Sequence, residues 1–304
     1  MRILHCFNWK LNDIISILEE VKKQGFDAIQ INPIQPLKED GLKEWWMSYQ
    51  PIGFSIGNYF GTKEDLIKLC AEASMYNIKI FSDVVINHMG AAIDDNFKPH
   101  TKVDPKLKKP EYWKNKVKVK DWKNRQDVIH NCIDLPGLNV YHKDVEDMIV
   151  IFLNELVDCG VMGFRFDAAK SIGLPSEGYR FWPNIIYRLK KYGLFLYGEV
   201  IFEEDIKIRD EYAEYMHLLG NYDCSDKNQM VKYIESHDTY LSDNELGYSK
   251  YWPSKLIVDE YCNLIKFYEN TLFYARPFDD AWKSIQIKEA HKLEKEKSKI
   301  LIYK

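Results

Sequence analysis

Acidic residues stand at the ends of several short apolar runs, where a buried strand would normally stay apolar. The acids with the most suggestive surroundings are Asp167, Glu199 and Asp238. Two carboxylates can cleave a glycosidic bond when one is a nucleophile or base and the other a general acid. Several carboxylates together can instead bind a divalent cation. These residue types therefore indicate either glycosidic chemistry or a metal-dependent reaction.

The neighbours of these acids favour glycosidic chemistry. Arg165 lies two positions before Asp167, on the same face of a strand, so its charge would keep that carboxylate ionised. Glu199 follows the apolar run LFLYG, and desolvation there would raise its pKa, as a general acid requires. His88 and His237 could hydrogen-bond sugar hydroxyls. The segment EWWMSYQP offers aromatic faces for sugar stacking at Trp45, Trp46 and Tyr49.

The apolar runs that would position these residues alternate with amphipathic helical patterns. The expected strands are residues 2–9, 26–34, 78–88, 161–168, 194–200, 230–238 and 271–278, with a weaker one at 214–220. The helical patterns are residues 11–25, 62–77, 142–160, 181–193, 254–269 and a charged final helix. This alternation predicts an α/β fold, a (β/α)8 TIM barrel, whose functional residues gather at the carboxyl ends of the strands.

Two spacings depart from a regular barrel. Residues 89–140 are too long for a plain loop and predict a small inserted subdomain after the third strand, which leaves 1–88 and 141–304 as the catalytic barrel. The chain between Glu199 and Asp238 is too short for two helices and a strand, so the sixth helix should be missing or reduced. One helix remains after residue 278, and no C-terminal β-sandwich is expected.

Composition excludes several classes of protein. The 304 residues are 46% hydrophobic and carry a net charge of −4, which gives no basic footprint for nucleic acid. No apolar run reaches transmembrane length, and the six scattered cysteines indicate neither a disulfide framework nor a zinc site. The N-terminus lacks a signal-peptide pattern, so the protein is expected to be soluble and cytoplasmic, or secreted if a signal peptide was removed.

Four segments together resemble a known family. DVVINH, GFRFDAAK, YGEV and ESHD are similar, in this order, to the signature segments of the α-amylase family, glycoside hydrolase family 13. WWMSYQPIGFSIGNYFGTKEDL resembles that family's segment after the second strand. The likeness runs from about residue 3 to residue 278 and is strongest to bacterial saccharifying α-amylases.

The resemblance implies a role for each residue that would do chemistry. Asp167 would be the nucleophile, Glu199 the acid/base residue, and Asp238 a third acid that stabilises the transition state. Arg165 would orient the nucleophile, and Asp83 would support the site from its strand.

It also implies a set of substrate-binding residues. Tyr49 would stack on the −1 sugar with Gln50 beside it, and His88 and His237 would surround that sugar. Lys170 would line the +2 side. The aromatic wall further along the cleft would consist of Trp45 and Trp46.

Calcium is the cofactor that the resemblance implies, between the barrel and the insertion. Asn87 matches one ligand and Asp127 an insertion ligand, with Asp134 as a nearby alternative. Ser171 stands where many members have a histidine that gives its backbone carbonyl, which any residue can supply. Gly137 stands where many relatives have another acid, so only part of the roughly 6–8 oxygens that calcium needs can be named.

The expected function is retaining, endo-acting hydrolysis of α-1,4-glucosidic bonds in starch, glycogen or maltodextrins, through a glycosyl-enzyme intermediate. The expected partner is thus an α-glucan oligosaccharide or polysaccharide, and the reduced architecture is compatible with an oligomer. An α-glucan transglycosylase would use the same acids. A non-catalytic glucan-binding protein derived from an amylase is the alternative from another class, and a metal-dependent barrel enzyme is a further one.

Overall fold

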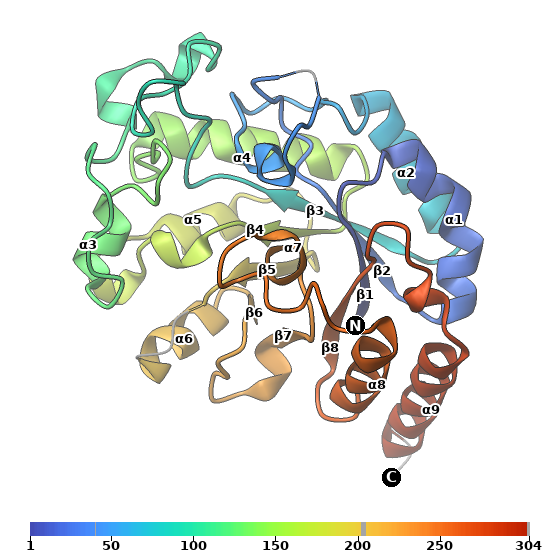
Figure 1. Cartoon of the computed structure of the whole chain (residues 1–304). Coiled ribbons are helices and arrows are strands. Elements are labelled where there is room, and N and C mark those ends of the chain that lie inside the picture. The colour runs from blue at the N-terminus through green and yellow to red at the C-terminus, as the bar shows by residue number, and fades with distance from the viewer. Residues whose placement is uncertain (40, 202–204, 303–304) are drawn as a thin grey trace.

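The computed structural model describes residues 1–39, 41–201 and 205–302. Within them, eight parallel strands close into a barrel in chain order. Helices surround this barrel (Figure 1), which confirms the predicted (β/α)8 TIM barrel. The strands are β1 Arg2–Cys6, β2 Ala28–Ile31, β3 Lys79–Val84, β4 Gly163–Phe166, β5 Phe195–Glu199, β6 His217–Leu219, β7 Met230–Tyr233 and β8 Asn270–Tyr274.

Most helices begin and end where the sequence places capping residues. Thr62 and Asp65 form a reciprocal capping box at the start of α2. Gly25 after α1 and Gly160 after α4 have φ of 86° and 101°, which glycine adopts without strain. The helices are α1 Leu11–Gln24, α2 Lys63–Met75, α3 Arg125–His130, α4 Lys143–Asp158, α5 Phe181–Tyr187, α6 Ile206–Ala213, α7 His237–Leu241, α8 Ser254–Leu264 and α9 Ile285–Ile302.

The barrel interior consists of an apolar layer beneath a polar one. Ile3, Phe81 and Tyr197, from β1, β3 and β5, belong to one buried cluster. Side chains two positions further along a strand point to the same side, so the next inward layer holds polar residues. These residues are His5, Gln30, Asp83, Arg165 and Glu199. The charged residues at the strand ends therefore form the upper layer of the barrel interior.

Residues 89–140 follow β3 and contain short helical elements. These are the 3-10 turns η2 Pro105–Leu107 and η3 Pro110–Tyr112, followed by α3. An isolated antiparallel bridge between His88 and Gly137 ties the two ends of this segment together. The boundaries proposed for an inserted subdomain stay a prediction.

The reduced sixth helix is confirmed. Between β6 and β7 the structure has only the 3-10 turn η6, Lys227–Gln229. The strand predicted at 230–238 is shorter than expected, because β7 ends at Tyr233 and Ser236 caps α7. Among the described residues, no helix combines the length and apolar character needed to cross a bilayer.

Candidate active site

The three predicted acids line one cleft at the carboxyl ends of the strands. Asp167 follows β4, Glu199 ends β5, and Asp238 stands in the first turn of α7. The cleft has a volume of about 600 Å³. Its other lining residues are Trp45, Trp46, Tyr49, Gln50, His88, Asn96, Ile133, Asp134, Leu135, Ala168, His237 and Leu246.

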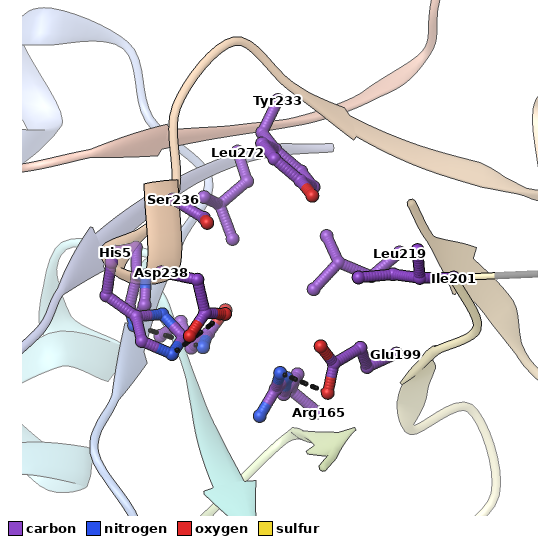
Figure 2. A pocket seen from close by; sticks show the side chains of 11 residues that line it. His5, Arg165, Glu199, Ile201, Leu219, Tyr233, Ser236, Asp238 and Leu272 are labelled. Carbon is purple, nitrogen blue, oxygen red and sulfur yellow. Dashed lines mark hydrogen bonds and ion pairs between the residues drawn. The ribbon is translucent and has the colours of Figure 1, made fainter. Parts of the chain in front are cut away.

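A much smaller pocket of about 20 Å³ adjoins this cleft and shares Glu199, His237 and Asp238 with it. Figure 2 shows Arg165 and Glu199 joined by an ion pair at one end of this pocket, with Asp238 across from Glu199. Buried polar and apolar barrel residues complete its lining. The acids therefore stand between the open cleft and the barrel interior.

The Arg165 guanidinium contacts carboxylates on three different segments. Its Nη1 lies 2.7 Å from Asp167 Oδ1 and 3.0 Å from Asp83 Oδ1, and its Nη2 lies 3.0 Å from Glu199 Oε2. The β3–β4 register places Asp83 directly opposite Arg165. The sequence paired Arg165 with the carboxylate of Asp167 alone, whereas the structure shows that the guanidinium is shared.

Because the Arg165 guanidinium contacts several carboxylates, the pKa values of the three acids differ from those expected from the sequence. Burial raises the pKa of Asp167 to about 7, although Arg165 opposes this shift. Burial and the charge of Glu199 raise the pKa of Asp238 to about 7. Burial also acts on Glu199, but Arg165 and the Ala168 N–H outweigh it and lower its pKa. In the substrate-free chain the pKa of Glu199 is thus lowered where the sequence predicted a raised one, and the pKa of Asp167 is raised although Arg165 contacts its carboxylate.

Asp83 has contacts that suit a supporting residue. It is fully buried, and it accepts a hydrogen bond of 2.8 Å from the Tyr49 hydroxyl in addition to its ion pair with Arg165. Burial raises the pKa of Asp83 to about 6, while Arg165 and Tyr49 oppose this shift. Tyr49 is thereby held over the site with its ring facing the Arg165 guanidinium at 5.6 Å.

Both predicted histidines lie at the cleft with neutral rings. His88 Nε2 is 3.0 Å from the Tyr49 carbonyl and 3.9 Å from Asp167 Oδ2, and burial lowers the His88 pKa. Burial and the charge of Arg165 lower the pKa of His237 to about 3. The His237 ring stacks on Tyr49 with centroids 5.2 Å apart. A neutral imidazole can donate one hydrogen bond and accept another, as a sugar hydroxyl requires.

The aromatic residues of the cleft come from one short element, the 3-10 turn η1 Trp45–Tyr49. Trp46 is 41% exposed, so its ring is available to a ligand, while Tyr49 is buried. Gln50 follows the turn and accepts a hydrogen bond from Lys38. This turn therefore presents the three predicted aromatic side chains and Gln50 to one cleft.

The cleft lining includes neither Lys170 nor Arg165, which were also predicted to bind substrate, and Arg165 lines the small pocket instead. The Lys170 ammonium donates to the Ile201 carbonyl at 3.0 Å and lies 4.7 Å from the Trp122 ring of the insertion. Lys170 thus connects the loop after β4 to the segment after β5 and to residues 89–140. Its role toward the +2 sugar stays a prediction.

The two predicted metal ligands do not share a site. Asp127 accepts hydrogen bonds from the Lys120 and Asp121 N–H groups, inside its own loop. Asn87 Oδ1 instead accepts from Lys114 Nζ at 2.8 Å. Burial lowers the pKa of Lys114 to about 7. Within the described residues, no group of three or more His, Cys, Asp or Glu side chains is placed to hold a metal ion. A lysine nitrogen thus contacts both Asn87 Oδ1 and the Ser171 carbonyl, the oxygens expected to bind calcium, so the residues present do not fit the implied ion.

Sequence reasoning missed several residues that shape the site. Lys114 is buried, yet in EYWKNKVKVK nothing distinguishes it from its exposed lysine neighbours. Glu235 and Arg276 form a buried bidentate ion pair that anchors the loop before Asp238. Glu235 belongs to the motif ESHD and could have been recognised from it, but its partner Arg276, which follows β8, could not. The missed cleft residues are Asn96, Ile133, Leu135, Ala168 and Leu246.

Asp238→Asn should stabilise the chain increasingly as the pH rises. The folded-state pKa of Asp238 is raised to about 7, so the native chain holds this proton more tightly than the unfolded chain. The wild type therefore loses the contribution of this group to its stability as the pH rises from about 4 to about 7. The amide in Asp238→Asn does not titrate, so the variant does not undergo this loss. The Asp238 side chain is 34% exposed, so solvent screens part of its charge and reduces the effect on stability. We therefore expect the Tm of Asp238→Asn to exceed that of the wild type by about 2–5 °C at pH 8.

Thermal unfolding followed by circular dichroism at several pH values would measure this gain. Asp243→Asn is the matched control, because Asp243 is 94% exposed and pairs with Lys250. The gain of Asp238→Asn should vanish near pH 4, and Asp243→Asn should show no such gain. A Tm difference for Asp238→Asn that is the same at acid and alkaline pH would contradict the raised pKa.

Comparisons with known proteins identify relatives of this chain. A family model described as "Alpha amylase, catalytic domain" matches residues 9–186. An α-amylase from Clostridium acetobutylicum is 34% identical over 269 residues, which cover 78% of this chain and 35% of that protein. An α-amylase from Hypothenemus hampei is 33% identical over 178 residues, which cover 55% of this chain and 36% of that protein. The chain thus spans about a third of the length of these curated relatives.

A solved structure has the same fold. The α-amylase from Geobacillus thermoleovorans superposes with a TM-score of 0.76 at 18% identity, over 97% of this chain and 78% of that one. At this identity the likeness concerns the fold alone. The family model, however, matches more than half of the chain, and its range includes β2, β3 and β4 and ends before β5. The chain therefore belongs to the α-amylase family, glycoside hydrolase family 13.

Proposed function

We propose that the protein hydrolyses α-1,4-glucosidic bonds of starch, glycogen or maltodextrins with retention of anomeric configuration. The observation that carries this proposal is the contact of Asp167 and Glu199 with two nitrogens of one guanidinium. Carboxylates that share a guanidinium stand close together, which suits the separation of about 5–5.5 Å in retaining enzymes better than the wider gap of inverting ones.

The proposed reaction has two steps. In the first, the Asp167 carboxylate attacks the anomeric carbon while Glu199 gives its proton to the glycosidic oxygen, so that the bond to the leaving sugar breaks. In the second, Glu199 takes a proton from water, and the resulting hydroxide displaces Asp167. Asp238 binds hydroxyls of the distorted sugar and stabilises the positive charge of the transition state.

The first step needs a proton on Glu199, whereas in the empty site the pKa of Glu199 is lowered and the pKa values of Asp167 and Asp238 are raised. Binding of a glucan would lower the pKa values of the aspartates and raise that of Glu199. Sugar hydroxyls that donate to an aspartate stabilise its ionised form, and a sugar that covers Glu199 removes water from it and raises its pKa. Substrate binding would thereby give each acid the protonation state that its role requires.

The α-glucan specificity rests on the cleft and on relatives. The exposed Trp46 ring and the neighbouring Trp45 suit stacking on successive sugar faces. The Geobacillus enzyme was solved with acarbose, and an Eisenia fetida α-amylase I variant, at a TM-score of 0.61 and 20% identity, was solved with maltohexaose. We extend this ligand class to the present chain.

Product analysis on maltoheptaose and soluble starch tests the function. We expect new reducing ends, short maltooligosaccharides rather than only glucose or maltose, and products that first appear as the α-anomer in ¹H NMR. First-formed β-anomers would contradict retention. Longer products without net reducing ends would favour the transglycosylase, and binding to amylose without any bond cleavage would favour the glucan-binding protein.

A further inference from the structure

Side chains hold three successive backbone carbonyls in the loop after β4. The Lys170 carbonyl accepts from Arg125 Nη1 at 2.6 Å. The Ser171 carbonyl accepts from Lys114 Nζ at 2.8 Å, and the Ile172 carbonyl from the Tyr212 hydroxyl at 2.6 Å. Two of these donors, Lys114 and Arg125, come from residues 89–140. This junction therefore fastens the insertion to the loop that follows Asp167.

Lys114 Nζ also links this loop to the end of β3. It lies 2.8 Å from Asn87 Oδ1 as well as 2.8 Å from the Ser171 carbonyl. These two oxygens are the ones that the barrel was expected to contribute to a calcium ion, with Asp127 as the ligand from the insertion. Calcium would stand about 2.3–2.6 Å from the same oxygens. The lysine nitrogen thus fills the place between them, and both groups cannot be present together.

The methylene groups of Lys114 fill the space next to Gly137, where relatives have an acidic ligand. A Cβ on Gly137 would lie 2.8 Å from Lys114 Cδ, so position 137 cannot carry an acidic ligand while the lysine stays in place. The Lys114 N–H also donates to the Gly137 carbonyl at 2.8 Å, which fixes the two segments against each other. The Asp127 carboxylate is occupied by N–H groups of its own loop.

We propose that the Lys114 side chain takes the place of a metal ion and joins Asn87 to Ser171 without calcium, while the Lys114 backbone N–H holds Gly137. The nitrogen carries enough N–H groups to donate to both oxygens, whether as an amine or as an ammonium ion. The buried oxygens are thereby satisfied by a group that the chain itself provides. The proposal concerns the stability of the junction and does not depend on the catalytic assignment.

The first test uses the wild-type protein and needs no activity. Its Tm should be the same in excess EDTA and in excess calcium chloride, and the purified protein should contain no stoichiometric calcium. A wild-type Tm that falls in EDTA, with calcium bound at one ion per chain, would overturn the proposal.

The second test removes the donor and keeps the stem. Lys114→Met should lower the Tm by about 4–10 °C in the presence or absence of calcium, because two buried oxygens lose their partner. Lys116→Met is the matched control, an exposed lysine two positions away whose change should leave the Tm nearly unchanged. Equal Tm values for the two variants would overturn the proposal. If Lys114→Met yields no folded protein, the wild-type measurements decide.

Discussion

Asp167→Asn and Glu199→Gln should each lower kcat on maltoheptaose by about 10³–10⁵-fold and leave the fold intact. The first variant loses the nucleophile, and the second loses the proton donor for the leaving sugar. Both substitutions keep the size of the side chain and its contact with Arg165. Steady-state kinetics and circular dichroism would measure the two effects. Glu64→Gln, at the exposed start of α2, is the matched control and should keep wild-type kcat.

Azide rescue would separate the two roles on an activated aryl maltooligosaccharide. In Glu199→Ala the intermediate on Asp167 still forms, because a good leaving group needs little protonation, and azide should trap it as the α-glucosyl azide. In Asp167→Ala, azide should instead attack in place of the nucleophile and give the β-glucosyl azide. The reverse pattern of anomers would contradict the assignment, and full activity in either parent variant would contradict the proposed mechanism.

The barrel and the gathering of the acids could be predicted because they depend on local patterns. Charges such as Arg165 and Glu199 stand in apolar runs where a strand alternates its faces, so they mark the polar layer of the barrel interior. The short segment of chain between Glu199 and Asp238 likewise predicted a missing or reduced sixth helix, because so few residues cannot form two full helices and a strand.

Features that depend on contacts between distant segments could not be predicted. The sequence shows that Arg165 is near Asp167, but only folding brings Glu199 to the same guanidinium, and this changes the pKa order of the acids. The same holds for Lys114. Its oxygen partners are Asn87 and the Ser171 carbonyl, 27 and 57 positions away, so its spacing carries no signal.

Replacing Arg165 should have the second large effect, on both activity and stability. Arg165→Lys should lower kcat by about 10²–10³-fold, because a single ammonium cannot contact Asp83, Asp167 and Glu199 at once. Arg165→Met should go further and lower the free energy of unfolding by about 3–5 kcal/mol at neutral pH, since it leaves buried carboxylates without their positive partner.

The stability loss in Arg165→Met should depend on pH in a defined direction. Arg165 lowers the pKa of Asp83, Asp167 and Glu199, so these pKa values rise when it is removed. Carboxyl groups with raised folded-state pKa values are tolerated while protonated and destabilise the fold once the pH passes the unfolded-state value. The variant should therefore lie closest to wild type near pH 4 and furthest from it near pH 8.

Urea unfolding at these two pH values would measure the difference. Lys190→Met is the matched control, because Lys190 is 57% exposed and pairs with Asp158, which is 56% exposed. Such pairs contribute about 0–1 kcal/mol, so that variant should differ little from wild type at either pH. If Arg165→Met were as stable as Lys190→Met at pH 8, the acids could not depend on a shared guanidinium, and the proposed assembly of the site around Arg165 would be wrong.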